Sequence, residues 1–397
     1  MAEPRRFFAK IGKTPSLFKN REALTEEFLP QNLPYRDREG DAIARILAPS
    51  LWKQKPSNAL IYGNPGTGKT AVTRLVLCQL QDEADRLHVP LKVLYVNCNI
   101  KGIADTEYRA VREFVHALGG TLPHRGLSKT EAYELFFDLL NQRRQHIIVV
   151  FDEIDRLMRH SGTDFLYTFT RIALRRATVS LVGITNNTTV MNYVDGRIRS
   201  SLSQQQVVFS PYNATQLATI LSQRMELAFQ PGVVEPAAIN KCAALGAQEH
   251  GDARRSLNLL RVAAETAHLE GAPSVAVQHV DRADEIISEH TVLQLIRSQP
   301  RQHTALLHCI LSLCDVEKRV QTGEVYTHYA KLVSELGLRC LTPERVSNIL
   351  ADLDTIGLIH SHVVSRGRFG RSREISVILP EAVRKLAAEE IKTILNL

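Results

Sequence analysis

Short apolar runs alternate with segments of helical spacing over the first half of the chain. Four runs, at 58–63, 93–98, 147–152 and 179–185, are rich in β-branched residues and apolar almost throughout. Continuous apolar runs of this length are typical of strands that are buried on both faces of a parallel sheet. A helical or loop segment follows each run, so residues 21–212 are predicted to form an α/β domain with a helix-covered parallel sheet.

Beyond Pro211 the strand-like runs give way to apolar residues at helical spacing. Glycine and proline residues separate four such segments, which favours the end of one helix before the next begins. The pattern predicts a small all-helical domain over 213–292. Its helices are expected at 214–229, 237–250, 253–271 and 277–290.

The last hundred residues combine three helical segments with two short strands. A hairpin tip rich in glycine and arginine, RGRFGR at 366–371, separates the strands. Three helices followed by a basic hairpin are typical of a winged helix, which we expect over 297–397. The helices are expected at 302–314, 322–336 and 342–356, and the strands at 358–365 and 373–379. Residues 1–20, at the other end of the chain, are basic and aperiodic and predict a loosely held arm.

Composition agrees with this picture and argues against several classes of function. Of the 397 residues 44% are hydrophobic, and the formal net charge of +7 fits a polyanionic partner. The sequence shows neither an apolar run of the ~18 residues that a membrane helix needs nor an export signal, so we expect a cytoplasmic protein without a membrane partner. Its six cysteines are scattered without a CxxC pair, which argues against a metal centre and a disulfide framework.

A glycine-rich segment joins the first predicted strand to the helix that follows it. Its backbone amides, together with the helix N-terminus, are suited to surround phosphate oxygens. Lys69 is expected to bridge the β- and γ-phosphates of ATP, and the Thr70 hydroxyl to ligate Mg²⁺. Because strand and helix are both in place, a chance glycine-rich turn has little weight. The segment consists of Gly63, Asn64, Pro65, Gly66, Thr67, Gly68, Lys69 and Thr70.

Two acids follow at the end of the third apolar run, in the sequence IIVVFDEID. The carboxyl ends of parallel strands lie at one edge of a sheet, so both acids are expected beside the phosphate loop. Asp152 is predicted to hold Mg²⁺ together with Thr70, and Glu153 to orient and deprotonate the attacking water. Capping of the next helix is an alternative that suits Asp155 better than this pair.

The fourth apolar run ends in two asparagines. An amide beside the γ-phosphate can position the lytic water without adding charge, and Asn186 is favoured for this role, with Asn187 as the second candidate. Asparagine is also common in turns, which is the alternative.

Two arginine-containing segments are candidates for sensing the nucleotide. Arg197, or else Arg199, is predicted to reach the nucleotide of a neighbouring protomer, although a solvated basic turn explains the segment nearly as well. Arg254 begins a helix of the all-helical domain, where it is predicted to touch the γ-phosphate. Its neighbour Arg255 is the second candidate for this role, although it is expected to be exposed.

The basic hairpin tip is a candidate nucleic-acid interface. Residues 360–378 carry four basic residues and one acidic residue, and arginines on such a wing suit phosphates or a narrow minor groove. Arg345 and Asn348 add a mildly basic face to the preceding helix, 342–357, the element that enters the major groove in winged helices. A winged helix that binds protein is the alternative. The candidates on the wing are Arg366, Arg368, Phe369, Arg371 and Arg373.

The order and spacing of these motifs resemble those of the archaeal replication initiators related to eukaryotic origin recognition complex subunits and the cell-division-cycle helicase loader. The resemblance extends over nearly the whole chain from Leu24 and implies an AAA+ P-loop domain, a helical lid and a winged helix. It rests on LPYRDRE (33–39), GNPGTGKT, IIVVFDEID, LVGITN, RIRSSL, PYNATQL (211–217), HGDARRSLNLLR (250–261) and VVSRGRFGRSREI (363–375).

The resemblance also implies roles for further residues. Tyr35 and Arg36 would line the adenine base, and Tyr212 and Arg224 would contact the nucleotide. Residues 99–120 match an insertion that touches DNA in these initiators, although the helix can equally be ordinary packing. There Lys101, Arg109 and Arg112 would face phosphates, while Val111, Phe114, Val115 and Leu118 would face the core.

Two positions depart from the family pattern. Gly196 replaces a common proline before Arg197, which weakens the assignment of Arg197 as a finger. Asn187 stands where an acid or a small residue is expected, so the end of that strand is less certain.

The resemblance implies an ATP-binding replication initiator that recognises double-stranded origin DNA and helps load the replicative minichromosome maintenance helicase. Slow ATP hydrolysis would act as a switch, with ATP or ADP and Mg²⁺ as cofactors, and a paralogous initiator is a further partner. We expect it on the nucleoid. Two alternatives remain, namely a signalling or transcription regulator whose winged helix binds protein, and a clamp-loader-like motor in which Arg197 acts in trans.

Overall fold

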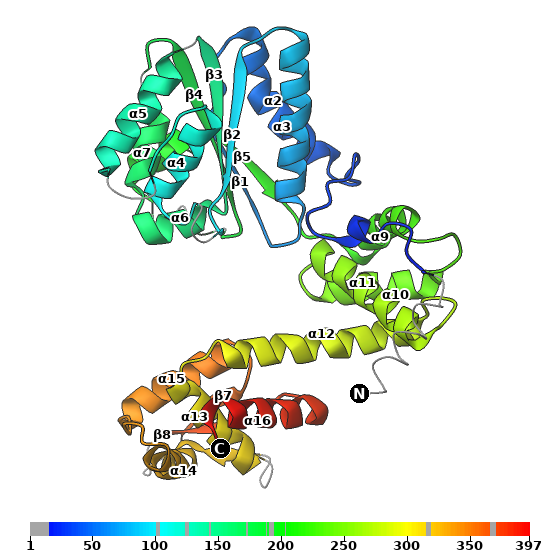
Figure 1. The fold of residues 1–397 in the computed structure, drawn as a ribbon. Coiled ribbons are helices and arrows are strands. Elements are labelled where there is room, and N and C mark those ends of the chain that lie inside the picture. Colours follow the sequence, from blue (N-terminus) through cyan, green and yellow to red (C-terminus); the bar gives the residue numbers. More distant parts are fainter. Residues whose placement is uncertain are drawn as a thin grey trace. The chain divides into compact units, whose positions relative to one another are not determined.

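A computed structural model describes residues 16–100, 104–123, 127–142, 144–171, 174–187, 189, 194–202, 204–314, 319–365 and 371–397. The chain divides into two compact units, residues 1–280 and residues 281–397, which are described separately (Figure 1). Within the described residues, no helix is both long enough and apolar enough to cross a membrane.

The first unit contains a parallel sheet of five strands in the order β2-β3-β4-β1-β5. The four predicted strands are confirmed, and a fifth that the apolar runs did not predict pairs with β1 at the edge. The strands are β1 (Ala59–Gly63), β2 (Leu91–Asn97), β3 (Gln145–Asp152), β4 (Ala177–Thr185) and β5 (Gln205–Phe209). Every residue of β3 from His146 to Asp152 is buried, as expected for a strand covered on both faces.

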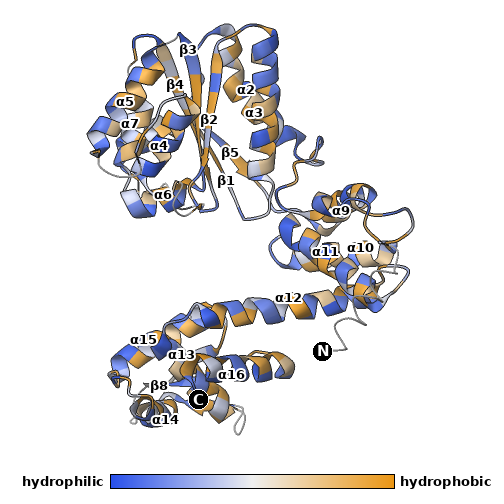
Figure 2. Ribbon diagram, viewed as in Figure 1, coloured by the Kyte–Doolittle hydropathy of each residue, from blue (hydrophilic) through white to orange (hydrophobic). Residues whose placement is uncertain are grey.

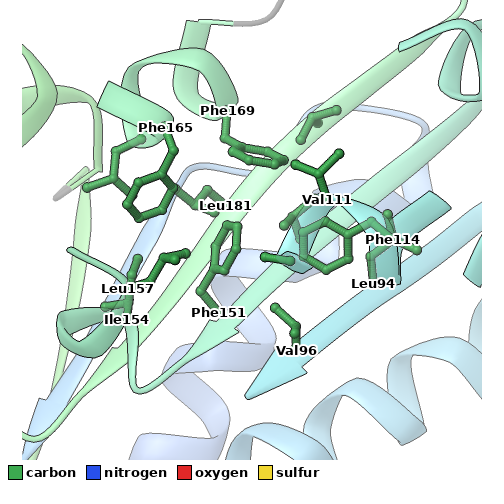
Figure 3. Close-up of a cluster of buried hydrophobic side chains, with 14 of the residues drawn as sticks. Leu94, Val96, Val111, Phe114, Phe151, Ile154, Leu157, Phe165, Phe169 and Leu181 are labelled. Carbon is green, nitrogen blue, oxygen red and sulfur yellow. The ribbon is translucent and has the colours of Figure 1, made fainter. Parts of the chain in front are cut away.

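Helices cover the sheet on both faces (Figure 1). Ile61, Val150 and Ile184 belong to one hydrophobic cluster, to which α2 and α3 contribute. On the opposite face, Phe151 of the sheet packs against Phe114 and Phe169 of the covering helices (Figure 3). Accordingly, the strands of this sheet carry many hydrophobic residues (Figure 2). The helices are α2 (Asp37–Leu47), α3 (Lys69–Arg86), α4 (Glu107–Ala117), α5 (Lys129–Asn141), α6 (Ile154–Ser161), α7 (Asp164–Arg171) and α8 (Gly196–Leu202).

The predicted helical domain is present after β5, and its four predicted helices are confirmed. They are α9 (Ala214–Ala228), α10 (Pro236–Gln248), α11 (Ala253–Glu270) and α12 (Val277–Arg297). Short 3-10 helices also occur, namely η1 (Arg21–Leu24) and η2 (Ala48–Trp52). The expected end of the helical domain, at residue 292, lies within α12, and the expected start of the winged helix, at residue 297, is the last residue of α12. Both boundaries stay predictions.

Residues 16–20 correct the expectation of a loosely held arm. The amides of Lys19 and Asn20 donate to the Ala228 carbonyl at 2.7 and 3.0 Å, and Phe18 stacks on Phe229. This part of the N-terminal segment is therefore fixed to the end of α9, while residues 1–15 lie outside the described residues.

The second unit has the predicted winged-helix elements. Its hydrophobic core includes Tyr329, Leu350 and Ile375. Its three antiparallel strands are ordered β6-β8-β7. The two-residue strand β6 was not predicted. The elements are α13 (Arg301–Cys314), β6 (Val320–Gln321), α14 (Thr322–Glu335), α15 (Pro343–Thr355), β7 (His360–Ser365), β8 (Arg371–Ser376) and α16 (Glu381–Leu395).

Candidate functional site

The predicted phosphate loop turns sharply between β1 and the first residue of α3, Lys69. Gly66 and Gly68 adopt φ values of +68° and +89°, a left-handed conformation that side-chain-bearing residues rarely accept. The Thr67 hydroxyl donates to the Asn64 carbonyl at 2.8 Å and closes the loop. The loop thus ends at a helix N-terminus, where unpaired amides favour anions.

Lys69 lies inside this loop. Its ammonium donates to the carbonyls of Gly63 and Asn64 at 2.8 and 2.7 Å, and the residue is 5% exposed. Burial, followed by the positive charge of Arg254, lowers the pKa of Lys69 to about 8. The ammonium group is therefore desolvated inside the loop. An anion bound there would compensate for the hydration that burial removes.

Asp152 meets Thr70 at the carboxyl end of β3. The Thr70 hydroxyl donates to Asp152 Oδ2 at 3.0 Å, so the two predicted Mg²⁺ ligands are already in contact. A hydroxyl and a carboxylate are hard oxygen donors of the kind that Mg²⁺ prefers, so the residues present fit that ion. Asp152 is 2% exposed and also accepts hydrogen bonds from Tyr95 and Asn97 of β2, which the sequence reasoning missed.

Glu153 follows in a strained backbone conformation. Its φ of +54° is rare for a residue with a side chain, and strain of this kind is concentrated at functional sites. Its amide donates to Asp152 Oδ1 at 3.0 Å. Burial and then the negative charge of Asp152 raise the pKa of Glu153, which moves this carboxylate toward the range of a general base at neutral pH.

The phosphate loop opens into a cavity of about 660 Å³ within the first unit. This volume lies in the range of small-molecule sites. Three groups of residues form its wall, namely the N-terminal segment 25–34, the site residues at the sheet edge, and residues of α9 and α11. The predicted residues on the wall are Gly66, Gly68, Lys69, Thr70, Asp152, Glu153, Asn186, Tyr212, Arg224 and Arg254.

The two asparagines after β4 differ in surroundings. Asn186 lines the cavity, whereas the Asn187 side chain accepts hydrogen bonds from the amide and hydroxyl of Thr189 at 2.9 and 2.8 Å. Asn187 therefore stabilises a local turn, and Asn186 is the one of the two that lines the cavity. Asp155, the alternative capping acid, is buried and accepts from the Thr185 hydroxyl at 2.9 Å.

Helix α11 brings Arg254 to the cavity. The Asp252 carboxylate caps the helix by accepting from the amides of Arg254 and Arg255. The Arg254 side chain is half exposed, with Nε 3.7 Å from a Glu26 carboxylate oxygen. The expectation that Arg255 is exposed is wrong, because its side chain is only 13% exposed and lies 3.0 Å from Glu249.

Arg197 and Arg199 belong to α8, and neither lines the cavity. Arg197 is exposed, and its amide donates to Asp195. The Arg199 guanidinium donates to the Val194 carbonyl at 3.3 Å. The assignment of Arg197 as a finger for a neighbouring protomer's nucleotide therefore stays a prediction.

Tyr35 and Arg36 are not among the residues that line the cavity, which differs from the expectation that they line the base. The Arg36 guanidinium sits 3.9 Å from the Tyr212 ring centroid and donates to the Ser210 carbonyl at 2.6 Å. The Tyr35 hydroxyl lies 3.1 Å from that of Thr219. Tyr212 lines the cavity, and Arg36 packs on its ring.

Arg224 has a role that the sequence did not indicate. Its guanidinium is buried and donates to the carbonyls of Ala23 and Phe28 at 3.1 Å each, and it lies 4.7 Å from the Phe28 ring centroid. Residues 25–34 follow directly and line the cavity. Arg224 therefore holds the N-terminal segment in place as one wall of the site.

The two arginines of α4, the candidate insertion helix, differ in exposure. Arg109 is partly exposed and pairs with Asp105 at 2.6 Å, so it remains accessible to phosphates. The expectation that Arg112 faces phosphates is corrected, because its side chain is 7% exposed and its guanidinium lies 3.0 Å from Glu113. Val111, Phe114 and Val115 are buried as predicted. Lys101 lies outside the described residues.

The winged helix of the second unit presents few of its candidate residues within the described part. Arg345 is exposed in the first turn of α15, whose Thr342 cap accepts from the Arg345 amide. The Arg373 guanidinium lies 3.5 Å from the Ser361 hydroxyl. Arg366, Arg368 and Phe369 lie outside the described residues, as does the side chain of Arg371, whose backbone begins β8.

Family models match three consecutive parts of the chain. An AAA domain matches residues 53–188, a Cdc6 AAA+ ATPase-type lid domain matches 218–285, and a CDC6 C-terminal winged helix domain matches 294–385. These spans follow the order of the elements described above.

Curated relatives match over nearly the full length. An ORC1-type DNA replication protein of Pyrococcus horikoshii is 41% identical, with 96% of this chain and 92% of the relative covered. ORC1-type DNA replication protein 1 of Aeropyrum pernix is 44% identical, with 91% and 92% covered. The solved structure of the Aeropyrum pernix ORC1 protein in complex with DNA is similar with a TM-score of 0.82 and 43% identity, covering 94% of this chain and 97% of that one.

Proposed function

This chain belongs to the family of ORC1-type DNA replication proteins, whose first domain is an AAA+ ATPase domain, and from that premise we propose that it is an ATP-binding initiator that recognises origin DNA and helps load the replicative minichromosome maintenance helicase. The observation that carries the proposal is the full-length match, at 43% identity, to a protein solved in complex with DNA. A paralogous initiator is a further proposed partner on DNA.

The nucleotide-binding roles follow from the cavity. Amides of 63–70 and the Lys69 ammonium would bind the phosphates, and Tyr212 would contact the base or ribose from the cavity wall. Thr70 and Asp152 would hold Mg²⁺, which when bound neutralises phosphate charge. Arg36 would act indirectly by packing on Tyr212, and Tyr35 by its contact with Thr219 of α9.

The hydrolytic roles fall to three residues around the same cavity. Glu153, with its raised pKa, would accept a proton from water, and Asn186 would orient that water. Arg254 would contact the γ-phosphate and so make the position of α11 depend on which nucleotide is bound. Arg197 is not among the residues that line the cavity, so as a finger, worth ~10³–10⁵ in rate, it would act on a neighbouring protomer's nucleotide, and hydrolysis by a single chain would be slow and act as a switch.

The DNA-binding roles are divided between the two units. On the winged helix, the proposed contacts are Arg345, Arg366, Arg368, Phe369, Arg371 and Arg373, and in the first unit they are Lys101 and Arg109. Charge neutralisation of phosphates makes such binding salt-dependent. Arg112 is withdrawn because its side chain is buried.

A titration of duplex DNA tests this proposal. Fluorescence anisotropy should give tighter binding to origin DNA than to a scrambled duplex of the same length and composition. Replacing Arg366, Arg368 and Arg371 with alanine should make the dependence of log K on log[salt] shallower, with the magnitude of the slope smaller by roughly 2 to 3. Each arginine that neutralises a phosphate accounts for about 0.9 of that magnitude. Equal affinity for both duplexes, or an unchanged slope in the variant, would contradict origin recognition.

A second function is favoured by one observation on α15. Its exposed residues include the acids Glu344 and Asp352 and the single base Arg345, a balance unlike that of a helix that reads DNA. A regulator whose winged helix binds protein would have such a face. In the same titration, this function predicts no effect of the triple wing variant on DNA binding.

A further inference from the structure

The Asp152 carboxylate is held by donors from two neighbouring elements besides its own strand. Its Oδ2 accepts from the Thr70 hydroxyl at 3.0 Å, from the Tyr95 hydroxyl at 2.5 Å and from the Asn97 amide at 3.5 Å. The Tyr95 contact is the shortest of the three and falls within the range of hydrogen bonds from hydroxyls to carboxylates, which are strong because the acceptor is charged. Tyr95 is therefore the main protein donor that fixes this oxygen.

The register of the sheet explains why Tyr95 reaches Asp152. Strands β2 and β3 are parallel, with Asn97 opposite Asp152, so Tyr95 is two residues earlier on the neighbouring strand. Residues two apart in a strand lie on the same face, which places Tyr95 and Asn97 on one side of β2. Helix α3 covers the Tyr95 ring, with the Arg74 guanidinium 4.9 Å from its centroid.

We propose that Tyr95 is a positioning residue that orients the Asp152 carboxylate and thereby sets the affinity of the nucleotide site for Mg²⁺. This inference rests on the proposed nucleotide function. The Glu153 amide holds Oδ1 at 3.0 Å, and Tyr95 holds Oδ2, so that together they fix the rotation of the carboxylate before the metal binds. Partners that orient metal ligands in this way typically change metal affinity by 10- to 100-fold.

The surroundings keep the Tyr95 hydroxyl a donor. A carboxylate oxygen accepts hydrogen bonds, so the phenol is the donor in the 2.5 Å contact between the two oxygens. Loss of the hydroxyl removes the shortest of the three hydrogen bonds to Oδ2 and leaves those from Thr70 and Asn97.

The test is a Mg²⁺ titration of the full-length Tyr95→Phe variant. Phenylalanine keeps the ring under Arg74 and removes only the hydroxyl. A fluorescent ATP analogue is bound first in EDTA, and Mg²⁺ is then added while fluorescence and melting temperature are followed. The matched control is Tyr108→Phe, which loses a hydroxyl bonded to the Pro123 carbonyl at 2.7 Å, away from the residues that line the cavity.

The expected result is a half-saturating Mg²⁺ concentration raised roughly 10-fold in Tyr95→Phe, with affinity in EDTA equal to that of the wild type. The control should match the wild type in both. An unchanged or lowered half-saturating concentration would overturn the positioning role, as would an equal loss of affinity with and without Mg²⁺, which indicates a general packing defect. If the wild type itself bound the analogue without any response to Mg²⁺, the proposed metal site would fail together with this inference.

Discussion

The backbone amide of Ala253 donates a 3.2 Å hydrogen bond to the Gly66 carbonyl, which joins the first turn of α11 directly to the phosphate loop. The Asp252 carboxylate, which caps that helix, also lies against Gly66. Glycine is required there for two reasons, namely its left-handed backbone and the close approach of a neighbouring side chain. The position of α11 is therefore linked to the shape of the loop.

Replacing Gly66 with alanine should lower both stability and nucleotide affinity. The new Cβ would collide with Asp252 Oδ1, and the backbone φ of +68° is itself unfavourable. We expect the free energy of unfolding to fall by about 1–3 kcal/mol from backbone strain alone, and further from the collision. Thermal unfolding followed by circular dichroism measures the change.

Gly119→Ala is the control for backbone strain. Its φ is +87°, and a Cβ there would meet nothing within 4 Å. Any decrease in stability beyond that of the control reports the collision with the cap of α11. Equal decreases in the two variants would show that the proximity of Asp252 contributes nothing.

Arg224→Lys should release the N-terminal wall of the cavity. Lysine retains the charge but cannot donate to the Ala23 and Phe28 carbonyls with the planar fork of arginine. We expect nucleotide affinity to fall by roughly 10-fold, the equivalent of one hydrogen bond from a charged group. Limited proteolysis should also cut near residues 23–34 faster than in the wild type.

Arg282→Lys is the matched control, because that arginine is exposed and its pairing with Glu285 at 3.8 Å is weak. It should behave as the wild type does. If Arg224→Lys retained full affinity and protease resistance, the proposed role of this arginine would be wrong.

Glu153→Gln should separate nucleotide binding from hydrolysis. The amide keeps the shape of the side chain and removes the proton acceptor, so steady-state ATP hydrolysis should fall ~10²–10⁴-fold. The dissociation constant of ATP, from equilibrium fluorescence, should change little. Hydrolysis at the wild-type rate would exclude Glu153 as the base and direct attention to another group around the cavity.

Two arginines of α4 should differ in what they affect. Arg109→Ala is expected to reduce the magnitude of the slope of log K against log[salt] for duplex DNA by about 0.9, the value for one phosphate contact. Arg112→Ala should leave that slope unchanged and instead lower the melting temperature, because it removes a partner from the half-buried Glu113. A change of slope with Arg112→Ala would show that the helix rearranges on DNA.

Fold and site were predictable to different degrees. The strands β1 to β4 are continuous apolar runs, which is the strongest signal a sequence gives for a buried parallel strand. The edge strand β5 begins with exposed Gln205 and Gln206 and buries only Val207 and Phe209 among its residues, so it resembles a polar loop. β5 thus lacks the apolar run that made β2, the strand at the other edge, predictable.

The misplaced Arg112 has a related cause. Helix α4 packs against both β2 and α5, so its buried face is wider than the single stripe of Val111, Phe114 and Val115. Hydrophobic periodicity locates the centre of such a face but not its edges.

Site residues within one motif were predictable, whereas those joined by tertiary contacts were not. Lys69, Thr70 and Asp152 belong to motifs whose spacing states their chemistry. Tyr95 reaches Asp152 only through the register of two strands, and Arg224 reaches Ala23 only through the packing of the N-terminal segment on α9. Neither contact leaves a local pattern in the sequence.

The most direct test of the central claim is a genome-wide map of where this protein binds on its own chromosome. Chromatin immunoprecipitation of the wild type should give a few discrete intergenic peaks that coincide with sites of replication initiation and that disappear in the triple wing variant. Binding spread evenly over the chromosome, or peaks at many promoters without replication initiation, would contradict the assignment as an origin-binding initiator.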